Sequence, residues 1–95
     1  QPQILIDFPE RDEELSILRE NLPFADDRML EYVTDFLQQA HNNDERFTVR
    51  DGINIGRYAI KLMTTLDGRA DFTHAVRFSI DKVLGEEALR YARRP

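Results

Sequence analysis

Residues 27–42 read DRMLEYVTDFLQQAHN, and this segment predicts a helical protein because its apolar side chains recur with the period of a helix. Asp26 or Asp27 suits the N-cap, and the polar run at 41–45 ends the helix in a turn. One face of such an amphipathic helix has to be buried against neighbouring helices. The stripe that forms this face is Met29, Leu30, Val33, Phe36, Leu37 and Ala40.

A shorter helix is predicted before this segment, from about Glu10 to Asn21. Pro9 suits its first turn, and the acidic residues that follow complement the positive end of the helix dipole. We expect these carboxylates to be exposed and to act through the dipole rather than in acid–base catalysis. The apolar stripe of this helix is Leu15, Leu18 and Leu22, and Pro23 stops it.

Two longer helices are predicted after residue 45. The first runs from about Arg50 to Leu66 and follows a brief extended connector at residues 47–49. The second is capped by Asp71 or Thr73 and ends before Gly85, which is a natural C-terminal stop.

A last short helix is predicted over residues 86–93, where arginines suit the negative end of its dipole. The fold class is therefore all-α: a small bundle of four to five helices in a single domain over residues 1–95. Residues 1–9 are expected to form a short extended segment, like the edge of a strand whose sheet lies elsewhere. This suggests that the chain is a fragment of a larger protein.

The composition excludes several kinds of function for this chain. The chain has 95 residues, no cysteine and a formal net charge of -5, so thiolate metal sites and cysteine nucleophiles are excluded. No apolar run approaches the length of a membrane span, and we expect a cytoplasmic domain. The acidic total argues against general nucleic-acid binding. The charge is uneven, because residues 1–47 hold 4 basic and 12 acidic side chains and residues 48–95 hold 9 and 6.

The helix predicted at 50–66 carries the strongest candidate for a binding site. Arg50, Asn54, Arg57 and Lys61 share a stripe about 60° wide, opposite an apolar stripe. Arginine and lysine in such a stripe suit phosphate oxygens. Each cation taken alone is better explained by a solvated face or by an ion pair to the acidic half than by a ligand. Arg50 differs, because a cation at a helix start opposes the dipole.

Other chemistry finds little support in the sequence. His41 and His74 are far apart and have no clustered carboxylates beside them, so no metal site is expected. No glycine-rich phosphate-binding loop is present anywhere in the chain. Catalysis by these 95 residues alone is therefore not expected.

Three segments resemble the lid subdomain of AAA+ ATPases, in particular the MoxR-like branch. ILIDFPERDEELSILREN at 4–21 resembles the junction between core and lid. RFTVRDGINIGRYAIKLM at 46–63 is similar to the sensor 2 segment, although Val49 stands where the family usually has proline. FTHAVRFSIDKVLGEEALRYARR at 72–94 is similar to the closing helices and is less diagnostic.

The resemblance implies a role for the chain within a larger ATPase. Arg50 would be the sensor 2 arginine that contacts the γ-phosphate of ATP, with Asn54 and Arg57 beside it. Ile17 and Leu18 match the helix that packs near the adenine. The intact protein would bind ATP with Mg²⁺ and couple hydrolysis to remodelling of a client protein, whereas the isolated chain would bind neither.

The partners implied by the resemblance are the AAA+ core of the same protein and the neighbouring ring subunits, with no nucleic acid and no membrane. Two other hypotheses remain open. One is a free-standing helical adaptor that binds an acidic partner through Arg50, Arg57 and Lys61. The other is a helix-turn-helix DNA binder that uses the helix at 50–66 for recognition.

Overall fold

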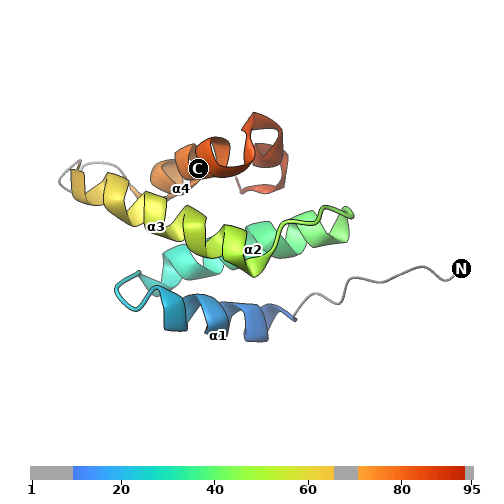
Figure 1. The fold of residues 1–95 in the computed structure, drawn as a ribbon, viewed down its shortest axis with the longest axis horizontal. Helices are drawn as coiled ribbons and strands as arrows, with labels where there is room; N and C mark the ends of the chain where they lie inside the picture. Colours follow the sequence, from blue (N-terminus) through green and yellow to red (C-terminus); the bar gives the residue numbers. More distant parts are fainter. Residues whose placement is uncertain (1–9, 66–70, 94–95) are drawn as a thin grey trace, which may run out of the picture.

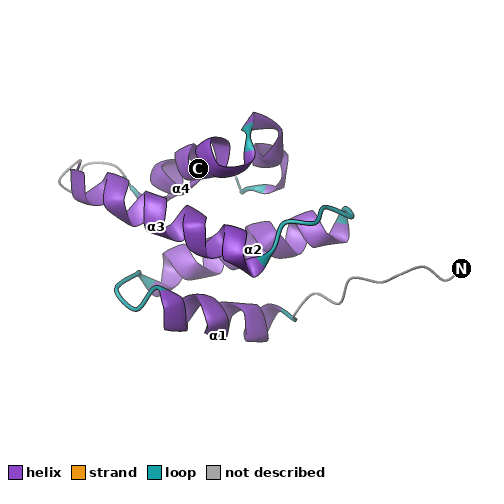
Figure 2. Cartoon of the chain, in the orientation of Figure 1, coloured by secondary structure: helices purple, strands orange, loops and turns teal. Residues whose placement is uncertain are grey.

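The computed structural model describes residues 10–65 and 71–93, and within these ranges every regular element is a helix (Figures 1 and 2). The elements are α1 (Arg11–Asn21), α2 (Asp27–Asn42), α3 (Val49–Thr65), α4 (Phe72–Leu84) and the 3₁₀-helix η1 (Glu86–Tyr91). The predicted all-α bundle is confirmed. The extended segment predicted at residues 1–9 lies outside the described residues, as do Leu66 and Arg94.

Helix α2 lies at the centre of the bundle. It contacts α1, α3, α4 and η1, whereas α1 and α4 lie on opposite sides of the α2–α3 pair (Figure 1). All six residues of its predicted stripe are buried, and Val33, Leu37 and Ala40 are completely inaccessible. The amphipathic pattern therefore identified the buried face of α2 correctly.

Two glycines let α3 approach α1 and α2 closely. A Cβ atom added at Gly52 would lie 2.7 Å from Leu37 Cδ1 and 3.3 Å from Leu18 Cδ2. A Cβ atom added at Gly56 would lie 2.4 Å from Leu22 Cδ1. Both glycines are buried, so the backbone of α3 takes the space that side chains occupy at an ordinary helix contact.

The helix starts follow local hydrogen-bonding chemistry. Asp26 caps α2 by accepting from the backbone N–H of Arg28 at 2.8 Å, and Asp71 caps α4 by accepting from the N–H of Thr73 at 2.6 Å. Helix α3 begins at Val49, one residue earlier than predicted. The prediction of an extended residue 49 was wrong because Thr48 is the cap, which leaves only residues 45–48 as the connector.

Gly85 ends α4 as predicted, with a φ of 103° that favours glycine. The short helix that follows is a single 3₁₀ segment and stops at Tyr91 rather than at residue 93. The chain is then held against the bundle, because the hydroxyl of Tyr32 and the guanidinium of Arg77 both donate to the carbonyl of Arg93.

We expect Gly52→Ala to lower the free energy of unfolding by about 1–3 kcal/mol, because overpacking against Leu37 outweighs the helix propensity that alanine gains. Urea unfolding followed by circular dichroism measures the change. Asn54→Ala, at an exposed position two residues along the same helix, is the control and should stay within about 0.5 kcal/mol of the parent. A Gly52→Ala variant as stable as the parent would show that close packing at this position is unimportant.

Candidate functional site

The four polar residues of the predicted cationic stripe are all exposed on α3. They are Arg50, Asn54, Arg57 and Lys61. The ion pairs found in the described ranges involve Arg11, Arg19, His74 and Arg93, and none of them uses a cation of this stripe. The acidic first half of the chain therefore does not neutralise these cations within the described residues.

Arg50 is positioned by a capping box at the start of α3. The backbone N–H of Thr48 donates to Asp51 Oδ2 at 2.9 Å, and the N–H of Asp51 donates back to Thr48 Oγ1 at 3.3 Å. Arg50 is the second residue of α3, so its side chain projects from the first turn. A cation there gains nothing from the helix dipole, and the nearest carboxylate in sequence is engaged with Thr48.

The two residues predicted to lie near an adenine have different environments on α1. Leu18 is fully buried and packs toward Gly52 of α3, whereas Ile17 is half-buried at the surface. Only Ile17 is therefore accessible to a ligand without a change in the core. Leu18 connects α1 to the N-terminal half of α3, and the contact of either residue with an adenine stays a prediction.

Glu14 of α1 lies in a different environment from the one predicted from its position in the sequence. It was expected to be an exposed carboxylate of the first turn, but it is completely buried. Gln38 Nε2 donates to its Oε1 at 2.9 Å, and its Oε2 has no hydrogen-bond partner among the described residues. Its position four residues before Leu18, on the same side of α1, was the signal that could have revealed the burial.

Burial raises the pKa of Glu14, because removal from water disfavours the charged carboxylate. The hydrogen bond from Gln38 and the proximity of His41 oppose this rise in pKa and are the smaller effects. His41 itself donates from Nε2 to the carbonyl of Phe47 at 2.6 Å, which ties the end of α2 to the connector before α3. The cluster therefore joins three segments around one buried carboxyl group.

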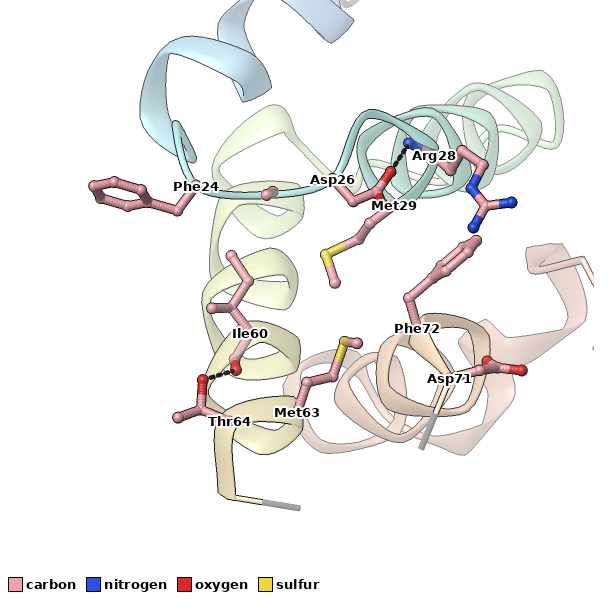
Figure 3. Close-up of a pocket in the computed structure, with 10 residues that line it drawn as sticks. Phe24, Asp26, Arg28, Met29, Ile60, Met63, Thr64, Asp71 and Phe72 are labelled. Atoms are coloured by element: carbon pink, nitrogen blue, oxygen red, sulfur yellow. Dashed lines mark hydrogen bonds between the residues drawn. The ribbon is translucent and has the colours of Figure 1, made fainter. Parts of the chain in front are cut away.

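A pocket of about 490 Å³ lies where the start of α2 meets the end of α3 and the start of α4 (Figure 3). Met29 and Met63 point toward each other across it, and the Phe72 ring extends toward the guanidinium of Arg28, which lies 5.7 Å from the ring centre. The pKa of Asp71 at its edge is lowered because backbone N–H groups of His74 and Thr73 donate to its carboxylate. None of the predicted site residues lines this pocket.

The described residues hold no group of three side chains of the kinds that bind metal ions. No helix in the same ranges is both long enough and apolar enough to cross a membrane. No protein-family model, curated protein or solved structure matches the chain. The AAA+ resemblance therefore depends on the sequence segments alone.

The buried carboxyl group should make stability depend on pH. Because the folded-state pKa of Glu14 lies above its ordinary value of 4.5, the folded chain holds this proton more tightly than the unfolded chain. The stabilisation is full below pH 4.5 and is lost as the pH rises through the folded-state pKa. We expect Glu14→Gln to raise the free energy of unfolding at pH 7 by about 1–3 kcal/mol and to change it little near pH 4.

Urea unfolding at a series of pH values measures this difference. Glu13→Gln removes a carboxylate from the exposed neighbouring position and is the matched control, with little change expected at any pH. Equal pH profiles for the parent and Glu14→Gln would contradict a raised pKa at this site.

Proposed function

We propose that the chain is the lid subdomain of a MoxR-like AAA+ ATPase and that Arg50 is its sensor 2 arginine. The observation that carries the proposal is the state of Arg50, which is exposed in the first turn of α3 and has no carboxylate partner among the described residues. A cation that neither the helix dipole nor an ion pair explains is suited to an external anion.

The surroundings of Arg50 favour the same ligand. Asn54 and Arg57 lie one and two turns further along the exposed side of α3, so three donor groups follow one line on the surface. Their donors suit the oxygens of a triphosphate. A contact between Ile17 and the base is supported by the resemblance alone, because α1 packs on the side of α3 roughly opposite Arg50. ATP with Mg²⁺ would supply the phosphoryl group that is transferred to water, and Arg50 would bind its terminal phosphate.

The departure from the family at residue 49 is compatible with this role. Val49 is the first residue of α3, immediately after the Thr48 cap. Proline is favoured at that first position because its missing N–H would have no helical partner there. The N–H group of a valine at this position also has no hydrogen-bond acceptor within the helix. The helix can therefore start at the same place with either residue.

The proposal implies a mechanical role for the bundle. A phosphate-binding loop and a metal-binding carboxylate would come from a core domain, because this chain has no such loop. The bundle would close over the nucleotide, and loss of the terminal phosphate would remove the contact with Arg50. The angle between bundle and core would then follow the nucleotide state and drive the remodelling of a client protein.

In the protein that joins this chain to its ATPase core, Arg50→Ala should reduce the rate of ATP hydrolysis about 10- to 100-fold, which corresponds to the loss of one charge-assisted hydrogen bond. Steady-state phosphate release measures the rate, and circular dichroism should show an unchanged melting temperature because the side chain is exposed. Arg90→Ala removes an exposed arginine from η1 and is the control. Equal rates for Arg50→Ala and the parent would remove Arg50 from this role.

The reading frame that encodes the chain separates this proposal from the adaptor hypothesis. A phosphate-binding loop encoded upstream of Gln1 is required by the lid proposal. A start codon at this position without such a loop would instead favour a helical adaptor that binds an acidic partner through Arg50, Arg57 and Lys61.

A further inference from the structure

Three large hydrophobic side chains are exposed within the described ranges, and they fall on two separate surfaces. Phe24, with 94% of its side chain area exposed, lies in the turn between α1 and α2. Tyr58 on α3 and Phe78 on α4 are 41% and 44% exposed. Aromatic side chains are enriched where proteins bind one another.

Tyr58 and Phe78 lie against each other, with ring centres 6.2 Å apart. The ammonium group of Lys82 lies 5.2 Å from the centre of the Phe78 ring, and a hollow of about 260 Å³ beside Tyr58 is also lined by Lys61 and Leu62. We call this set of five residues the cationic aromatic surface. It combines an apolar floor with two ammonium groups at its edge.

The charges of this surface are not balanced by ion pairs with the residues that the structure describes. Neither Lys61 nor Lys82 takes part in an ion pair with a described carboxylate. Asp81 is the nearest acidic residue in the sequence of α4, but it is half-buried and lies about 100° around the helix from Lys82. The surface is therefore complementary to an apolar group flanked by carboxylates.

Phe24 is such a group. It follows Pro23 at the turn of the α1–α2 hairpin, and its ring points away from the neighbouring pocket (Figure 3). The exposed charged residues nearest to it, in the last turn of α1 and the first two turns of α2, carry four carboxylates and two cations. The carboxylates are those of Glu20, Asp26, Asp27 and Glu31, and the cations are Arg28 and Arg19, which pairs with Asp27.

We propose that two copies of this chain bind head to tail, with Phe24 of one copy in the hollow of the cationic aromatic surface of the other. The acidic hairpin then faces Lys61 and Lys82, and all three exposed aromatic residues leave water in one contact. Charge complementarity between two parts of the same chain is what favours a second copy over an unrelated partner.

The geometry of the bundle makes this contact heterologous. Ile60 lines the pocket beside Phe24, and it lies about 160° around α3 from Tyr58. The hairpin turn and the cationic aromatic surface are thus on different sides of α3, so one copy can use both at once. A heterologous contact of this kind closes into a ring or extends into a filament. The contact between copies involves neither Arg50 nor a nucleotide, so its test is independent of the test of the proposed function.

Sedimentation equilibrium of the chain from about 10 µM to 1 mM tests the association, since small interfaces bind weakly. The average mass should rise with concentration, and raising the salt from about 50 mM to 500 mM should weaken binding several-fold because it screens the charges. Phe24→Ser and Tyr58→Ser should each weaken it at least about tenfold. Both side chains are exposed, so circular dichroism should show folded variants. Arg90→Ser is the control and should behave as the parent.

Mixing the two variants identifies the mode of contact. Phe24→Ser keeps an intact hollow and Tyr58→Ser keeps an intact Phe24, so an equimolar mixture should form a one-to-one dimer with the affinity of the parent and no larger species. A constant monomer mass for the parent at all concentrations would overturn the proposal. It would also be overturned if either variant associated as well as the parent, or if the mixture failed to form the dimer.

Discussion

The close approach of α3 to the α1–α2 hairpin at Gly52 and Gly56 determines how the rest of the bundle is arranged. With no side chains at these positions, Leu18, Leu22 and Leu37 pack directly on the backbone of α3. The two glycines lie on the side of α3 roughly opposite Arg50 and Lys61. The packing that buries the glycines therefore holds the cationic stripe outward. The rotation of α3 about its own axis determines both which residues enter the core and which charged residues face outward.

The acidic side chains of the α1–α2 hairpin have several different structural roles. Asp26 caps α2, and Asp35 pairs with both Arg11 and Arg93, which holds the end of the described chain against the bundle. Glu14 is buried with a single hydrogen-bond donor. In a chain of 95 residues with a thin core, one carboxyl group removed from water is a sizeable part of the stability margin. Several of the carboxylates that make the net charge negative therefore have structural roles.

The sequence predicted those features that depend on local periodicity and capping. The α2 stripe and the Gly85 stop follow from short-range rules, and Asp26 and Asp71 were each one of two residues that these rules predicted as caps. The errors at residue 49 and at the end of η1 concern local helix boundaries, whereas the error at Glu14 arose where two helices meet. Glu14 appears as one more acidic residue of a first turn until α2 covers it. The close contact of Gly52 with Leu37 was not predicted and likewise depends on the neighbouring helix. The environment of such a residue is determined by helices that are distant in the sequence. The pattern of a single segment does not reveal these neighbours.

The candidate site could be predicted only as a line of residues on one helix. Its exposure depends on which face α3 buries, and the start of α3 depends on the Thr48–Asp51 capping box, which brings Arg50 into the first turn. The cationic aromatic surface needs one further step, because Tyr58 and Phe78 are 20 positions apart and meet only where α3 packs on α4. Both surfaces are carried by α3, one along its cationic stripe and one at its border with α4. A change in the rotation of α3 would therefore displace both together, although neither surface includes the glycines that fix that rotation.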